Sequence, residues 1–178
     1  IAKGVDIRLQ PEFPSLKGRP TPGRLQKLAR AMRGYDLVCT YNWGAMDAVM
    51  AHTLFTDAMG LPPLIHHEDG FNEDEQERLK TSRNWYRRIA LGKASGLVVP
   101  SEVLEGIALE TWQQPIGRVA RVRRELQPGA AVDGALGVPL PAFRGEEGGR
   151  GRIILVVVVC HCAAATTDKE YAAAAVPK

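Results

Sequence analysis

The segment 66–71 (HHEDGF) places two imidazoles beside two carboxylates and a glycine turn. An imidazole can donate or accept a proton near neutral pH, and a neighbouring carboxylate can accept hydrogen bonds from hydroxyl groups. Three roles are open to these side chains: ligands of a divalent ion, a structural histidine bonded to the backbone, or contacts to a ligand in a cleft. Strand alternation turns His66 and His67 to opposite faces, which argues against a metal site.

A second polar segment, 41–44 (YNWG), offers an aromatic ring, an amide and a glycine turn. An indole ring such as that of Trp43 packs on the C–H faces of sugars, and a side-chain amide such as that of Asn42 forms hydrogen bonds with hydroxyl groups. The alternative is that Trp43 and Tyr41 fill the top of the core. A third polar position, Ser101, is a helix cap or a nucleophile, and the absence of G-x-S-x-G around it favours the cap. The chain also has no G-x-G-x-x-G and no Walker A loop.

These segments each follow a predicted strand. Continuous apolar stretches predict buried strands at 36–40, 63–67 and 96–99, with helical spacing between them and a fourth strand near 119–122. Alternating strands and helices predict an α/β fold, a doubly wound parallel sheet with right-handed crossovers. Ligands bind beyond the carboxyl ends of such strands. We therefore expect His67, Glu68 and Asp69 to line an open cleft with Asn42 and Trp43.

A long helix is predicted from Glu73 to about Lys93, with Asn72 as its N-cap. Acidic residues occupy its first turns and basic residues its later turns, which suits the helix dipole. Its buried side is predicted to hold Leu79, Tyr86, Ile89 and Ala90. Its basic residues would form a solvated face, and peripheral contact with anionic lipid is an accessory expectation. These residues are Arg83, Arg87, Arg88 and Lys93.

Composition excludes several classes of protein. The 178 residues are 45% hydrophobic and 24% charged, as in ordinary globular domains rather than disordered chains. A net charge of +3 is too weak to indicate nucleic-acid binding. Three cysteines are too few for a disulfide framework, and a reducing cytoplasm suits them best. The chain has no initiator Met and begins within a predicted strand, so we expect it to be part of a longer protein.

The chain divides near residue 124. Residues 1–124 are predicted to form a Rossmann-like domain, and residues 125–178 a linker with the partial start of a second domain. Residues 153–159 have the pattern of a central strand, and the alanine-rich end predicts an irregular tail. The triplet Cys160-His161-Cys162 lacks the second pair of ligands that a zinc site needs.

Residues 1–124 resemble the N-terminal, acceptor-binding domain of a GT-B glycosyltransferase of the family-four type. The resemblance rests on the order of three strand ends: Asp36-Leu-Val38, Ile65-His-His67 before Glu68-Asp-Gly70, and Val98-Val-Pro-Ser101-Glu102. It implies the Rossmann-like half of a GT-B fold and a retaining transfer of a sugar from a nucleotide-sugar to an acceptor hydroxyl. Reaction would occur in a cleft between this half and a second GT-B domain.

The same resemblance implies no metal and no cofactor beyond the nucleotide-sugar co-substrate. The acceptor would be a carbohydrate or a lipid-linked sugar of cell-envelope polysaccharide biosynthesis, and the enzyme would be cytoplasmic, peripheral to the inner membrane. His67 matches the family's cleft histidine, with His66 as the alternative if the register differs by one. The family's glycine-rich first loop and its donor-phosphate residues have no counterpart here, so we expect the chain alone to be inactive.

The alternative to an enzyme is a flavodoxin-like binding or regulatory module, in which 66–71 is a surface turn. On the enzyme interpretation His67 is the catalytic candidate. The other candidates, all for binding the acceptor, are Asn42, Trp43, Gly44, His66, Glu68, Asp69, Gly70, Phe71 and Ser101.

Overall fold

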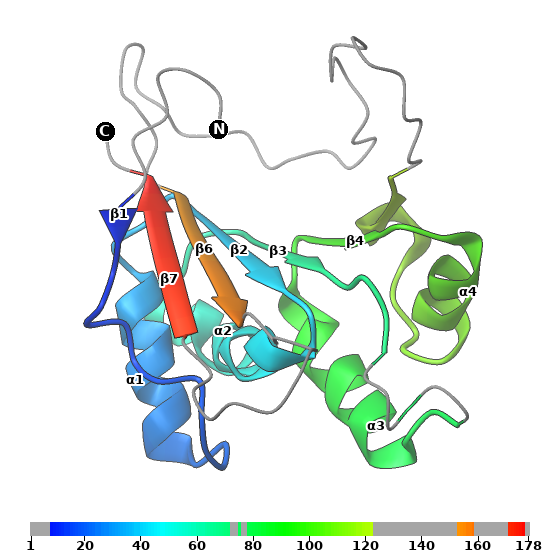
Figure 1. The fold of residues 1–178 in the computed structure, drawn as a ribbon, viewed down its shortest axis with the longest axis horizontal. Helices are drawn as coiled ribbons and strands as arrows, with labels where there is room; N and C mark the ends of the chain where they lie inside the picture. The colour runs from blue at the N-terminus through cyan, green and yellow to red at the C-terminus, as the bar shows by residue number, and fades with distance from the viewer. Residues whose placement is uncertain (1–7, 72–74, 76–77, 123–152, 159–170, 177–178) are drawn as a thin grey trace, which may run out of the picture.

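The structure is a computed structural model that describes residues 8–71, 75, 78–122, 153–158 and 171–176 (Figure 1). Its strands are β1 (Arg8–Leu9), β2 (Leu37–Tyr41), β3 (Leu64–His67), β4 (Gly96–Val99), β5 (Val119–Arg121), β6 (Ile153–Val158) and β7 (Tyr171–Val176). Its α-helices are α1 (Pro22–Met32), α2 (Met46–Met59), α3 (Thr81–Ala90) and α4 (Glu102–Glu110). Single turns of 3₁₀ helix are η1 (Trp43–Ala45), η3 (Leu91–Lys93) and η4 (Ile116–Arg118).

All of the strands belong to one sheet, in the order β1-β7-β6-β2-β3-β4-β5. Strands β6, β2, β3, β4 and β5 are parallel to one another, whereas β7 is antiparallel to both β6 and β1. Strands β2, β3 and β4 are interior, which agrees with their continuous apolar sequences. The predicted α/β class with a parallel, Rossmann-like sheet is therefore confirmed.

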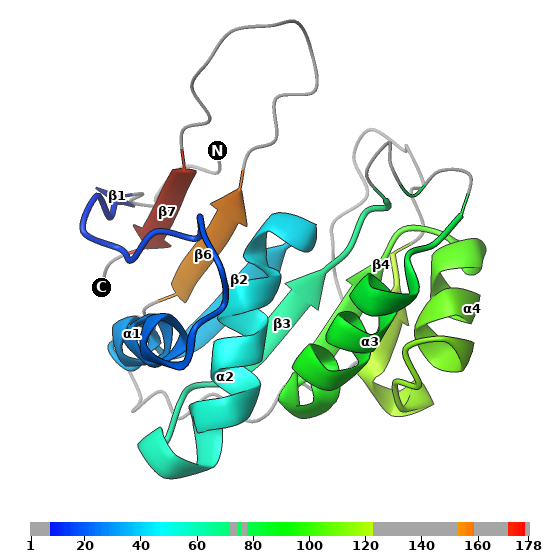
Figure 2. The ribbon, with the colours of Figure 1, turned by 90° about the horizontal axis from the view of Figure 1, so that it is seen from below.

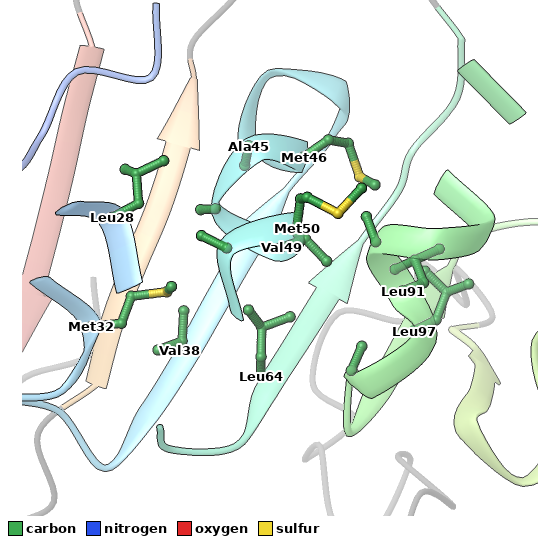
Figure 3. Packing of buried hydrophobic residues seen from close by; sticks show 14 of the residues in the cluster. Leu28, Met32, Val38, Ala45, Met46, Val49, Met50, Leu64, Leu91 and Leu97 are labelled. Carbon is green, nitrogen blue, oxygen red and sulfur yellow. The ribbon is translucent and has the colours of Figure 1, made fainter. Parts of the chain in front are cut away.

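Helices α1, α2 and α3 lie side by side over one face of the sheet (Figures 1 and 2). Leu28 and Met32 of α1 and Val49 and Met50 of α2 lie over Val38 of β2 and Leu64 of β3, both fully buried (Figure 3). Each of the crossovers from β2 to β5 moves one strand further along the sheet, so the polar ends of β2, β3 and β4 follow one another along a single edge. This order is what brings the candidate site together.

Helix boundaries follow the expected local signals at most ends. Pro22 occupies the first turn of α1 with Thr21 as N-cap. Gly60 ends α2 in the left-handed conformation, at φ 60° and ψ 51°. Ser101 caps α4, where its Oγ accepts a hydrogen bond from the Leu104 N–H at 3.2 Å.

The predicted helix over 73–93 is wrong over residues 78–80, which are not helical, and its predicted N-cap, Asn72, lies outside the described residues. Helix α3 begins at Thr81 with Lys80 as N-cap, and its axis continues only as the 3₁₀ turn η3. Glu75 is buried rather than solvated, and its Oε1 accepts from the Lys80 N–H at 3.2 Å. A carboxylate bonded inward to the backbone in this way stops the helical pattern that acidic residues favour on a solvated first turn.

The predicted faces of α3 are also partly wrong. Ile89, predicted to be buried, is 53% exposed, whereas Arg87, predicted to be solvated, is completely buried. Arg87 therefore cannot belong to a basic surface with Arg88 and Lys93. Arg88 lies over the exposed ring of Trp85, and Lys93 forms an ion pair with Asp57. The sequence placed Arg87 outside because an arginine without visible partners is normally solvated.

Part of the predicted irregular tail, residues 171–176, is the strand β7. Alanine has weak strand propensity, and here backbone pairing along the whole of β6 outweighs it. Strand β6 in turn pairs with β2, so both C-terminal strands join the same sheet although the sequence divides near residue 124. Residues 1–7, where the chain begins, and Cys160-His161-Cys162 lie outside the described residues. None of the helices within the described ranges has the length and apolar content to cross a bilayer.

Candidate functional site at the carboxyl edge of the sheet

The polar segments after β2, β3 and β4 are joined directly to one another. Tyr41 and His67 are register partners at the ends of β2 and β3. The ladder continues past both strands, because the Asn42 N–H donates to the His67 carbonyl at 2.8 Å. One residue further, the Glu68 N–H donates to the Val98 carbonyl at 3.0 Å. The predicted clustering of Asn42 with His67 at one edge is thus what the structure shows.

Alternation along β3 divides the HHED segment into two pairs. His66 and Glu68 are completely buried and share a face with Leu64, on the helix-covered side of the sheet. His67 and Asp69 belong to the opposite face, and their side chains are 40% and 41% exposed. Only the second pair is therefore placed to meet a ligand from solvent.

We call Tyr41, Asn42, His67 and Asp69 the edge cluster. The Asp69 carboxylate lies at its centre. His67 Nε2 lies 2.7 Å from Asp69 Oδ1, and the Tyr41 hydroxyl donates to Asp69 Oδ2. The Tyr41 and His67 rings are edge-to-face, with centroids 5.1 Å apart and an interplanar angle of 81°. These contacts fix both the position and the plane of the imidazole.

Asn42 links the two loops of the edge cluster and has a strained backbone. Its Oδ1 accepts from the Asp69 N–H at 2.7 Å, and its carbonyl accepts from the Ala45 N–H at 3.0 Å. Its φ of 54° with ψ of 179° lies in a region that is essentially restricted to glycine. A non-glycine residue kept in this conformation is typical of functional sites, where the surrounding bonds over-determine the geometry.

The pKa of His67 lies below its ordinary value, which favours the neutral imidazole at neutral pH. Burial lowers its pKa below the ordinary value, and a charge on His66 lowers it further, while Glu68 works in the opposite direction. A neutral imidazole carries one ring hydrogen, and an ionised carboxylate can only accept.

The buried pair belongs to a separate charged cluster around Arg87. Arg87 Nε lies 3.2 Å from Glu68 Oε2, and its terminal nitrogens lie 3.5 Å from both oxygens of Glu75. Arg83 Nη1 donates to Glu75 Oε2 at 2.9 Å. Burial raises the pKa of Glu75, but the bond from Arg83 and the charge of Arg87 outweigh it, so the net shift is downward. We call Glu68, Glu75, Arg83 and Arg87 the Arg87 cluster.

Three aromatic rings enclose the Arg87 guanidinium. Its central carbon lies 4.7 Å from the ring centre of Trp43, 5.1 Å from that of Phe71 and 5.3 Å from that of Trp112. Cation–π attraction of this kind strengthens as the cation loses its water. The rings come from the segments after β2, β3 and α4, so one buried cation joins three loops.

His66 completes the buried side. Its Nδ1 lies 2.8 Å from the Thr40 hydroxyl on β2, and its Nε2 lies 3.6 Å from Glu68 Oε2. Trp43 and Phe71 also belong to this side of the sheet, opposite to His67, where they are partly buried against the core. Trp43 packs against the core, as the structural alternative expects, and His66 is a structural histidine held by the Thr40 side chain rather than by the backbone.

The remaining predicted site residues act through the backbone or as a cap. Gly44 lies in the turn η1, Gly70 has a φ of 157°, and the Ser101 hydroxyl is bonded to its own helix. Tyr41, Arg87 and Trp112 are contributors that were not predicted as site residues. Tyr41 could have been found from its place at the end of β2, one residue before Asn42. Arg87 and Trp112 gave no local signal.

No metal-binding group is formed by the residues described: three or more His, Cys, Asp or Glu side chains are nowhere suitably grouped among them. Comparison with protein-family models, with curated proteins and with solved structures found no match to this chain.

Proposed function

We propose that this chain is the acceptor-binding part of a retaining glycosyltransferase, in which His67 contacts the reacting sugar. The observation that carries the proposal is the His67–Asp69 pair: a neutral, half-exposed imidazole held by a carboxylate at the carboxyl edge of a parallel sheet. The nucleotide-sugar donor and a carbohydrate or lipid-linked acceptor follow from the family resemblance.

The chemistry of the edge cluster suits a polyhydroxylated ligand. Imidazole and phenol groups both donate and accept hydrogen bonds, and a carboxylate accepts them, so together they can bond to hydroxyl groups in either direction. Asn42 and Asp69 are tied together by the Asp69 N–H bond, so the two loops present these groups as one unit. Preorganised groups of this kind stabilise a transition state without reorganising at the moment of reaction.

The test compares two adjacent histidines in the protein with its second domain. A panel of nucleotide-sugars is supplied with sugar and lipid-linked acceptors, and turnover and melting temperature are measured for wild type, His67→Ala and His66→Ala. We expect His67→Ala to lower kcat by about 10²–10⁴-fold with little change in melting temperature. His66→Ala should instead lower the melting temperature, because His66 is buried and bonded to Thr40.

Two controls complete the design. Turnover that persists in EDTA is expected, since the proposed mechanism uses no metal. Normal turnover of His67→Ala would remove His67 from the reaction. Failure of every donor to react with a correctly folded protein would contradict the transferase and favour a non-catalytic binding module.

A further inference from the structure

We propose that Tyr41 and Asp69 are positioning residues that hold His67 with its hydrogen on Nε2, so that Nδ1 is the atom His67 offers to a substrate hydroxyl. The proposal rests on the proposed function for the identity of the ligand. The tautomer itself is a property of the free protein and is tested separately.

The close contact between His67 and Asp69 favours one position of the imidazole hydrogen. His67 Nε2 lies 2.7 Å from Asp69 Oδ1, and because an ionised carboxylate has no hydrogen to give, this contact is favourable when the ring hydrogen is on Nε2. Nδ1 is then a lone-pair acceptor, and no hydrogen bond engages it within the part of the chain that the structure describes. An acceptor at this position recognises an O–H donor such as a sugar hydroxyl and repels a carbonyl or phosphate oxygen.

Tyr41 contacts both the Asp69 carboxylate and the His67 imidazole. Its hydroxyl donates to Asp69 Oδ2, which leaves Oδ1 for His67. Its ring also stands edge-to-face against the imidazole. Tyr41 therefore restrains the carboxylate and the imidazole plane together, and it faces away from the Arg87 cluster.

The Asp69→Asn variant makes this arrangement measurable. If Tyr41 continues to donate, the amide oxygen must face Tyr41 and the amide N–H must face His67. His67 Nε2 would then have to accept, and the ring hydrogen would move to Nδ1, the tautomer that cannot accept from a hydroxyl there. Adding Tyr41→Phe frees the amide to turn its oxygen to His67, which restores the original tautomer.

The experiment is ¹⁵N NMR of the histidine side chains in the 178-residue chain without ligand. The ring nitrogens report which one carries hydrogen. His52 is the internal reference, because its Nε2 lies 2.7 Å from the Pro62 carbonyl, an acceptor only, and is remote from the substitutions. We expect wild-type His67 to carry hydrogen on Nε2, Asp69→Asn to shift population to Nδ1, and the double variant to shift it back.

A wild-type His67 with its hydrogen on Nδ1, or an unchanged tautomer in Asp69→Asn, would overturn the proposal. Loss of folding is excluded by unchanged His52 signals in the same spectra. In the protein with its second domain, Asp69→Asn should lower kcat by about 10–100-fold, with a smaller change in KM. This is the size of loss found when a residue that orients a functional histidine is replaced. A confirmed tautomer shift without any sugar transfer would refute the proposed function and leave the assignment of Nδ1 intact.

Discussion

Arg87 and Glu68, one on helix α3 and one just beyond strand β3, form a completely buried ion pair with 3.2 Å between Nε and Oε2. Glu68 lies between His67 and Asp69 in the sequence, so this buried bond holds the backbone from which the two exposed side chains project. Buried charges are costly to leave alone, and Glu75 and three aromatic rings also surround Arg87.

Arg87→Met should be strongly destabilising. It leaves the buried carboxylates of Glu68 and Glu75 without their shared cation, at an expected cost of about 3–5 kcal/mol in the free energy of unfolding. Urea denaturation measures this directly. Arg88→Met on the same helix, which removes only a contact with an exposed ring, should cost less than about 1 kcal/mol. Equal losses for the two variants would contradict the central role of Arg87.

Coupling between the two partners can be measured as well. Glu68→Gln combined with Arg87→Met should cost less than the sum of the single losses, since each single variant already breaks the same bond. Additive losses would mean that the two side chains act independently.

Glu75 makes stability depend on acid pH. Its pKa in the folded state lies below the ordinary value of 4.5, so the unfolded state binds a proton at higher pH than the folded state does. The contribution of Glu75 is therefore complete above the ordinary pKa and is lost as pH falls through the folded pKa. Unfolding free energies measured from pH 6 to about pH 3 should fall less steeply in Glu75→Gln than in wild type. Glu12→Gln, at an exposed loop position, should keep the wild-type slope.

Two residues with similar positive φ should respond differently to glycine. Gln113, at φ 52°, is exposed, and Gln113→Gly should stabilise the protein by about 0.5–1 kcal/mol because left-handed backbone is cheap for glycine. Asn42→Gly also relieves backbone strain but loses the bond to the Asp69 N–H, so it should give little or no gain. Asn42→Ala keeps the strain and loses the bond, at an expected cost of about 1–3 kcal/mol. A stabilised Asn42→Gly would show that the side-chain bond contributes nothing.

The two helix caps offer a matched pair for thermal or urea denaturation. Ser101→Ala removes a formed bond to the Leu104 N–H and should cost about 1 kcal/mol. Thr21 occupies the same position on α1 without a side-chain cap bond, so Thr21→Ala should change stability by less than about 0.5 kcal/mol. The reverse order would indicate that Thr21 is bonded in solution.

The sheet was predictable from the sequence because each interior strand carries an unbroken apolar stretch, as in Leu37–Cys39 and Leu97–Val99. The placement of Asn42 beside His67 followed from strand order alone, since carboxyl ends of parallel strands share an edge. Alternation along β3 also predicted that His66 and His67 would face opposite ways.

The burial of Arg87 was not predictable, because the partners that neutralise it are distant in sequence and ordinary in kind. The position of Glu75 is typical of the first turn of a solvated helix, and Trp112 gives no sign in the sequence that it contacts a charged group. Only the folded arrangement brings two carboxylates and three rings to one guanidinium. The bond between the Tyr41 hydroxyl and Asp69 was not predicted, because an aromatic ring at the end of a strand is typical of core packing.

Because residues 66–69 alternate between the interior and the surface, substitutions at these four positions have two different consequences. Positions 66 and 68 are constrained by the interior, whereas positions 67 and 69 can change their chemistry at little cost to folding. A lineage of such proteins could therefore acquire new ligand preferences by substituting the outward positions alone. Loss of a single residue between Leu64 and Asp69 would be a different event, because the two sets would exchange faces and abolish the interior and the recognition surface together.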